Sequence, residues 1–162
     1  MSWYHLNVSI HVLAALVWLG GMFFLALVGA PALRTIESPA LRAQLFRVLG
    51  ERFRKVGWIC IAILLITGAL NLHFRGLLSD HVLNGTIWAT SYGRTLAIKL
   101  LAVLGMLIIQ AIHDFLHGPA ASRAMPGSES ALRMRRRAAL MARASALLGI
   151  IVLLAAVRLT RP

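Results

Sequence analysis

The stretch that decides the fold is YHLNVSIHVLAALVWLGGMFFLALV, residues 4–28. It carries no Asp, Glu, Lys or Arg, and it runs into Gly29, Ala30 and Pro31, which are expected to end it. A helix needs about 20 mostly apolar residues to cross the hydrocarbon core of a bilayer. Three later stretches meet this requirement, at residues 56–74, 95–115 and 138–159. The sequence therefore predicts an all-α integral membrane four-helix bundle, built as a single transmembrane domain over residues 1–162.

The composition supports a membrane protein. Of the 162 residues, 59% are hydrophobic and 14% are charged. Soluble domains average about 45–50% apolar and about 25% charged residues. A chain with so few charges cannot cover a water-facing surface, so membrane lipid is its expected partner.

The positive charge is placed between the apolar stretches. The chain has 17 Lys and Arg against 5 Asp and Glu, a net charge of +12. Charges that flank apolar stretches are typical of loops beside a bilayer and not of a groove for a phosphate backbone, so we expect no nucleic-acid partner.

The same charges predict the orientation of the chain. Six lie between the first and second spans, at Arg34, Arg42, Arg47, Arg52, Arg54 and Lys55. Five lie between the third and fourth spans, at Arg123, Arg133, Arg135, Arg136 and Arg137. Only Arg75 and Arg94 lie between the second and third. The positive-inside rule then predicts a multi-pass plasma-membrane protein with the first and third connections in the cytoplasm and both termini on the outer (periplasmic or extracellular) side.

A short helix is expected at the cytoplasmic surface before the second span. Ser38 followed by Pro39 is typical of an N-cap and a first-turn proline. Apolar residues then recur at every fourth position: Leu41, Leu45, Leu49 and Phe53. This spacing predicts a short amphipathic helix that leads into the span at 56–74.

Ionisable residues inside the spans are candidates for function, because they are costly in hydrocarbon. With this orientation, His11 and Lys99 each lie roughly 10 Å below the outer boundary at about 1.5 Å per residue, and His73 is shallower. Three nitrogen-bearing side chains from three helices are expected to meet in one pocket in the outer half of the bundle.

Two helix faces combine histidine with methionine. Lys99, Met106, Gln110, His113 and His117 share one face of the third span, and His11 and Met22 share one face of the first. Imidazole and thioether groups suit copper in either oxidation state. His113 and His117, beside Asp114, form a candidate second metal pair near the cytoplasmic boundary. The alternatives are that the methionines pack in the core, that Lys99 snorkels, and that His117 is an interfacial residue.

The sequence lacks the residues and motifs of several other kinds of site. Cys60 is the only cysteine, so an intramolecular disulfide and a cysteine zinc site are excluded. With five acidic residues and no phosphate-binding loop or nucleophile elbow, the sequence also argues against hydrolytic enzymes. Redox chemistry, metal binding and ligand binding remain.

Several short strings resemble the copper resistance protein D family. They are HVLAALVWLGG at residues 11–21, PALR at 31–34, RFRKV at 52–56, LITG at 65–68, and YGR at 92–94 followed by Leu96 and Lys99. The chain resembles a compact four-helix form of that family along essentially its whole length. The resemblance implies copper binding or import across the bacterial inner membrane without an enzymatic step, with His11 and His73 as ligands or pathway residues. Because four helices form a narrow bundle, a homo-oligomer is one way to provide a path for copper.

The layout is also similar to the small membrane protoporphyrinogen oxidases that hold haem b. His11 and Lys99 match the early histidine and the third-helix lysine of that group. This resemblance implies His11 and His73 as axial ligands, with Arg75 and Arg94 near the haem propionates. A third alternative is an accessory membrane subunit without a cofactor. Copper handling is the preferred interpretation.

Overall fold

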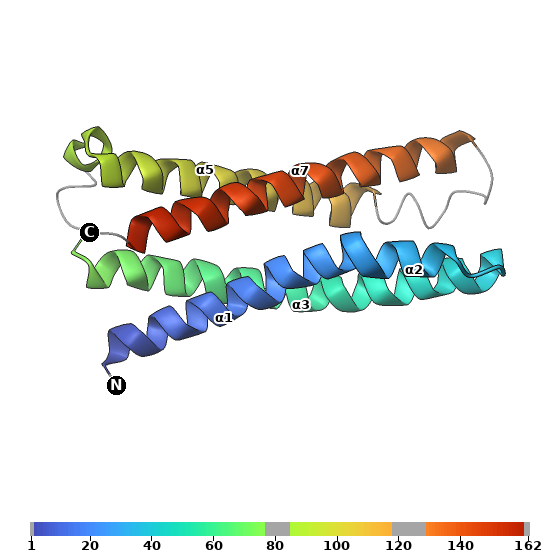
Figure 1. Cartoon of the computed structure of the whole chain (residues 1–162), viewed down its shortest axis with the longest axis horizontal. Helices are drawn as coiled ribbons and strands as arrows, with labels where there is room; N and C mark the ends of the chain where they lie inside the picture. The colour runs from blue at the N-terminus through green and yellow to red at the C-terminus, as the bar shows by residue number, and fades with distance from the viewer. Residues whose placement is uncertain (1, 77–84, 118–128, 161–162) are drawn as a thin grey trace. The chain divides into compact units, whose positions relative to one another are not determined.

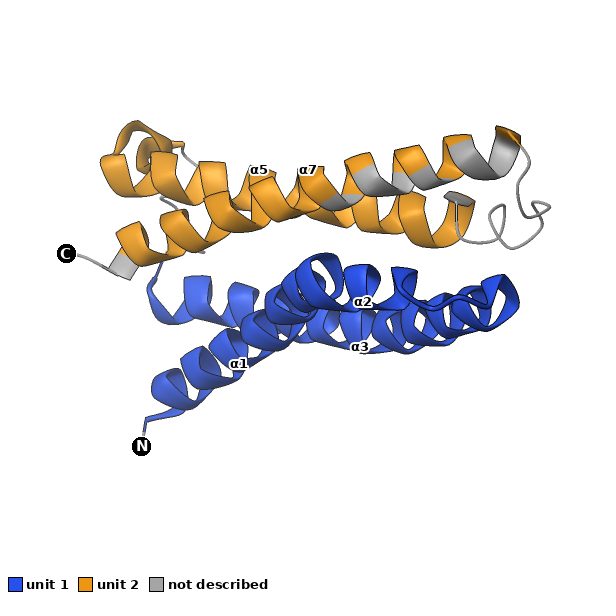
Figure 2. Ribbon diagram, turned by 45° about the vertical axis from the view of Figure 1, so that its right-hand side comes forward, with its two compact units in different colours: residues 1–84 blue, residues 85–162 orange. Residues whose placement is uncertain are grey.

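The computed structural model describes residues 2–76, 85–117 and 129–160, and these residues form two compact units (Figure 1). Residues 1–84 form the first unit and residues 85–162 the second (Figure 2). Each unit is a pair of long helices that run side by side in opposite directions. The association of the two pairs into one four-helix bundle stays a prediction.

The first unit consists of α1 (Trp3–Phe24), the π-helical turn η1 (Leu25–Gly29), α2 (Ala30–Arg34) and α3 (Pro39–Phe74). α1 packs against α3, and two glycines allow this approach. A Cβ on Gly57 would lie 3.7 Å from Cδ1 of Trp18, and a Cβ on Gly21 would overlap the ring of Phe53. The glycines thus let aromatic rings lie directly on the backbone of the opposing helix.

The ends of these helices differ in part from the prediction. The Ser38 hydroxyl accepts the backbone N–H of Leu41, and Pro39 opens the helix, so the predicted N-cap is confirmed. The surface helix is not a separate element: residues 39–74 form one unbroken helix of 36 residues. Nor does Pro31 end the first helix: it lies in the first turn of α2, which follows η1 directly.

The second unit consists of the 3₁₀ turn η2 (Thr86–Ala89), α5 (Ser91–Ala111), the π-helical segment η3 (Ile112–His117) and α7 (Glu129–Thr160). The Thr90 hydroxyl caps α5 by accepting the N–H of Gly93 at 3.0 Å. A Cβ on Gly105 would lie 3.1 Å from Leu148, so α5 and α7 are closely packed there. α7 begins at Glu129, nine residues before the predicted span, and therefore includes the arginine run from 133 to 137 in its first turns.

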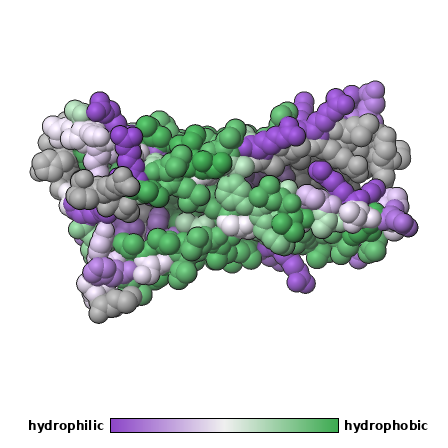
Figure 3. All heavy atoms as spheres, viewed as in Figure 1, coloured by the Kyte–Doolittle hydropathy of each residue, from purple (hydrophilic) through white to green (hydrophobic). Residues whose placement is uncertain are grey.

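Among the described residues, three helical stretches are long and apolar enough to cross a membrane: Trp3–Arg34, Pro39–Phe74 and Ser91–Leu116. Along them hydrophobic side chains cover the middle, and hydrophilic ones gather toward the ends (Figure 3). Many large apolar residues of these stretches are exposed, among them Leu27 at 73% and Leu101 at 68%. Such exposure is expected of side chains that face lipid. The chain is a multi-pass membrane protein, and the span predicted at 138–159 within α7 stays a prediction.

Candidate functional site

Four polar residues meet between α1 and α3, and we refer to Asn7, His11, Thr67 and Asn71 as the polar seam. Asn7 and His11 are one turn apart on α1, and Thr67 and Asn71 are one turn apart on α3. The Asn7 amide donates to the Thr67 carbonyl oxygen at 3.0 Å and to Oδ1 of Asn71 at 2.9 Å. Nδ1 of His11 lies 2.7 Å from the Thr67 hydroxyl oxygen. The seam therefore joins two apolar helices by hydrogen bonds between polar side chains that lie at the same level of the interface.

Thr67 is the centre of the seam. It is buried, and its hydroxyl oxygen lies 2.6 Å from the carbonyl oxygen of Ile63 in the preceding turn. The His11 ring lies over the neighbouring glycine, because a Cβ on Gly68 would be 3.5 Å from Cε1 of His11. His11 itself is half-buried. The imidazole is thus fixed both by a polar contact and by its packing on α3.

Beyond His11 the interface becomes apolar. Trp18, two turns further along α1, is only 3% exposed and packs on Gly57. Beside it an apolar groove has Cys60 in its wall together with Ile10, Leu13, Ala14, Val17 and Ile63. In the described part of the first unit, the hydrogen-bonded polar side chains between α1 and α3 thus lie toward the N-terminus of α1, before Trp18 and the groove.

His73 and Arg75 lie at the end of α3 next to the start of α1. His73 is exposed and stands two residues beyond Asn71, about 200° round the helix, so it faces away from the seam. Arg75 donates from Nε and Nη2 to the Tyr4 hydroxyl at 3.3 and 3.2 Å. The structure therefore brings His11 together with Thr67 and does not bring His73 to it.

The predicted residues of the second unit occupy different environments. On α5, Arg94 is exposed, Lys99 is half-buried and Met106 is only 1% exposed. Met106 is thus packed as a core side chain. The approach of Lys99 to His11 stays a prediction, because the two residues belong to different units.

Met22 cannot share an ion with His11. It is half-buried on α1, eleven residues from His11. At about 1.5 Å per residue, the two positions are roughly 16 Å apart along the helix axis. Copper–ligand bonds are far shorter, so a Met22 ligand would require a site of its own.

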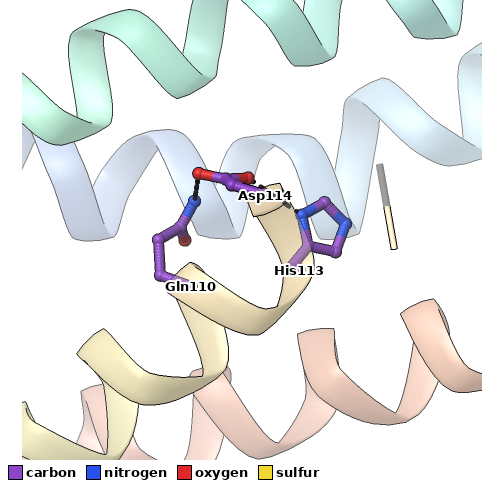
Figure 4. A network of polar contacts seen from close by, with 3 residues as sticks. All are labelled: Gln110, His113 and Asp114. Carbon is purple, nitrogen blue, oxygen red and sulfur yellow. Dashed lines mark hydrogen bonds and ion pairs between the residues drawn. The ribbon is translucent and has the colours of Figure 1, made fainter. Parts of the chain in front are cut away.

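A second polar cluster lies where α5 passes into η3 (Figure 4). Asp114 is 5% exposed, and its Oδ2 accepts the Gln110 amide at 2.8 Å. Its Oδ1 lies 3.1 Å from Nδ1 of His113, which is half-exposed. The His117 side chain lies outside the described residues, so the predicted pair of His113 and His117 stays a prediction. Among the residues that are described, no cluster of three or more His, Cys, Asp or Glu forms a metal site.

The sequence pointed to His11 but not to its partners. The signal was present: Asn7 and His11, like Thr67 and Asn71, are polar residues four apart within apolar spans, which places each pair on one helix face. Asp114 offered a similar signal, since it follows Gln110 by four residues. What the sequence did not contain was the register between α1 and α3.

Comparison with known proteins adds a family match. The family model "Copper resistance protein D" matches residues 47–159, which include α5 and most of α3 and α7 but not α1. An uncharacterized protein of Aquifex aeolicus (strain VF5) is 38% identical over 65 residues. That alignment covers 40% of this chain and 44% of the relative, so the chain spans less than half of the relative's length. No solved structure matches the chain.

Proposed function

Because the chain belongs to the copper resistance protein D family, we propose that it binds copper at His11 and imports it through the membrane. The family implies a membrane copper-resistance function. Import and the identity of the ligands are our proposal. The family match begins after α1, so the role of His11 rests on the geometry of the polar seam.

One observation carries the proposal: a half-buried histidine is held between two apolar helices by a hydrogen bond to Thr67, with 2.7 Å between Nδ1 and the hydroxyl oxygen. Ionisable side chains in a membrane span are costly and mark ion or ligand pathways. Imidazole is a good ligand for copper.

The positions of His11 and His73 suggest a route. The positive-inside rule places the N-terminus of α1 and the end of α3 on the periplasmic side of the inner membrane. His73 is exposed at that end, and Thr67, which holds His11, is six residues deeper, about 9 Å along α3. Copper entering from that side would pass the level of His73 before it reaches His11. Lys99, Met106 and the pair of His113 and His117 would belong to the rest of the route, and a homo-oligomer would supply further ligands.

The test is the absorption spectrum and the copper and iron content of the detergent-purified protein. Retained copper that is lost in His11→Ala supports the proposal. His5→Ala is the matched control, since His5 is an exposed histidine on the same helix that contacts Ser2. Equal copper loss in both variants, or copper retention in His11→Ala, would overturn the assignment of His11.

The same sample distinguishes the alternatives. A haem b protein, with His11 and His73 as axial ligands and Arg75 and Arg94 near the propionates, would be red and would show a Soret band that shifts on reduction. An accessory subunit would take up neither copper nor haem and would be unchanged by His11→Ala. Either result would contradict copper handling.

A further inference from the structure

The Thr67 hydroxyl has two backbone carbonyl oxygens of its own helix within reach, that of Ile63 and, farther away at 3.5 Å, that of Leu64. A threonine hydroxyl has a single hydrogen, and a backbone carbonyl oxygen is an acceptor only. The Thr67 oxygen lies 2.6 Å from the Ile63 carbonyl oxygen. Two oxygens without a hydrogen between them would repel each other at this separation, which is typical of a strong O–H···O bond. The hydroxyl therefore donates to Ile63.

It follows that Thr67 accepts from His11. With its hydrogen committed to the Ile63 carbonyl, the hydroxyl oxygen meets Nδ1 of His11 at 2.7 Å only as an acceptor. Nδ1 must then carry the proton. In a neutral imidazole one nitrogen is protonated and the other has the lone pair, so the lone pair lies on Nε2.

We infer that Thr67 is a positioning residue that holds His11 in the Nδ1–H tautomer, so that Nε2 is the nitrogen that binds the metal. The inference rests on the proposed copper function for its purpose, but the tautomer itself is a property of the metal-free protein. Metal-binding histidines commonly donate their second nitrogen to an oxygen acceptor, which fixes the tautomer and the ring orientation. Here the acceptor comes from the opposing helix.

The contacts of Thr67 also show why valine is the informative substitution. Valine has nearly the shape of threonine, so it preserves packing while it removes the acceptor. Thr67→Val removes the hydroxyl oxygen that accepts from Nδ1 of His11, so the proton can move to Nε2. Thr67→Ser keeps the hydroxyl and should keep the tautomer.

A matched control exists on α5. The Thr95 hydroxyl donates to the carbonyl oxygen of Ser91 at 2.9 Å, the same bond to the preceding turn that Thr67 makes to Ile63. No hydrogen bond joins Thr95 to a histidine among the described residues. Thr95→Val therefore repeats the chemical change at a threonine that bonds only within its own helix.

The first experiment is ¹⁵N NMR of the metal-free protein, labelled at histidine, with the His11 signals assigned by their loss in His11→Gln. We expect a protonated Nδ1 and an unprotonated Nε2 in the wild type, Thr67→Ser and Thr95→Val, and a shift toward protonated Nε2 in Thr67→Val. A wild-type His11 protonated at Nε2, or a Thr67→Val spectrum identical to wild type, would overturn the inference. Circular dichroism and gel filtration establish that each variant is folded.

The second experiment is a copper titration of the same four proteins. Removal of an outer partner of a metal-binding histidine typically weakens binding about 10–100-fold, and we expect a loss in that range for Thr67→Val alone. If the wild type shows the expected tautomer but binds no copper, the proposed function fails and the positioning role of Thr67 stands. If it binds copper at His11 with equal affinity in Thr67→Val, the function stands and the positioning role fails.

Discussion

The Asn7 side-chain amide donates at once to Oδ1 of Asn71, at 2.9 Å, and to the Thr67 carbonyl, at 3.0 Å. Both acceptors are on α3, so one buried amide fixes the register of α1 against α3. Without that register His11 would not lie opposite Thr67. The hydrogen bonds of Asn7, one helical turn from His11, thus set the geometry of the candidate metal site.

Asn7→Leu should destabilise the first unit. Leucine has a similar volume but no donor, and hydrogen bonds between membrane helices contribute about 0.6 kcal/mol on average and about 1.7 at most. We expect a loss of about 1 kcal/mol in the free energy of unfolding, measured by denaturant titration in detergent. Ser9→Ala is the control, because the Ser9 hydroxyl bonds only within its own helix, to the His5 carbonyl. Equal stability of Asn7→Leu and wild type would show that the seam does not hold the helices together.

Gly93→Ala should be among the most damaging small substitutions in the chain. An added Cβ would overlap the carbonyl oxygen of Ile87, which belongs to η2 and is backbone that cannot rotate away. The start of α5 would have to separate from η2, at an expected cost of about 2 kcal/mol or more. In Gly50→Ala no atom lies within 4 Å of the new Cβ, so the better helix propensity of alanine should leave stability equal or higher. Thermal unfolding of the two variants provides the comparison, and a neutral Gly93→Ala would contradict the close packing of η2 on α5.

Gln110→Leu should destabilise the second unit, since it removes a donor from a buried carboxylate. Asp114 is 5% exposed, and its Oδ2 receives the Gln110 amide at 2.8 Å. Hydrogen bonds to charged groups contribute about 1.5–3 kcal/mol, and a loss of that order is expected in denaturant titrations. Gln44→Leu makes the same change at an exposed position of α3 and should have little effect. Similar stability of both variants would mean that the Asp114 carboxylate does not depend on Gln110.

Cysteine labelling tests the orientation. With Cys60 replaced by alanine the chain has no thiol, and Ser2→Cys and Gln44→Cys each add one. A membrane-impermeant thiol reagent should label Ser2→Cys in intact spheroplasts and Gln44→Cys only after lysis, because the loop between the first two spans carries six of the positive charges. The reverse pattern would place the polar seam at the cytoplasmic side and would contradict the proposed route.

Local signals in the sequence predicted local structure well. Ser38 and Pro39 started a helix where their capping chemistry indicated, and three of the four predicted spans lie in helices long and apolar enough to cross a membrane. The predicted ends were less accurate, because helix ends depend on neighbours. Pro31 was expected to end a helix. It lies instead just after the π turn, in the first turn of α2, and α2 continues to Arg34.

Of the candidate site, only His11 could be predicted from the sequence. His11 is conspicuous, because an imidazole within apolar residues needs a reason to be there. Thr67 is not conspicuous: a threonine in a span commonly bonds to its own helix, as Thr95 does. Only the pairing of α1 with α3 turns that ordinary residue into the partner of His11, and the sequence of either helix alone does not contain the pairing.

The π turn at Leu25–Gly29 has a consequence for comparing this chain with its relatives. A π turn is an α-helix with one residue inserted, so everything beyond it, including Pro31 and Arg34, is rotated by about 100° relative to a continuous α-helix. Leu27 within it is 73% exposed and contributes little packing. Relatives that lack the insertion would align with a single gap at this point and would keep His11 opposite Thr67. A one-residue deletion here should be accepted, whereas the same deletion between Asn7 and His11 would separate the two halves of the seam.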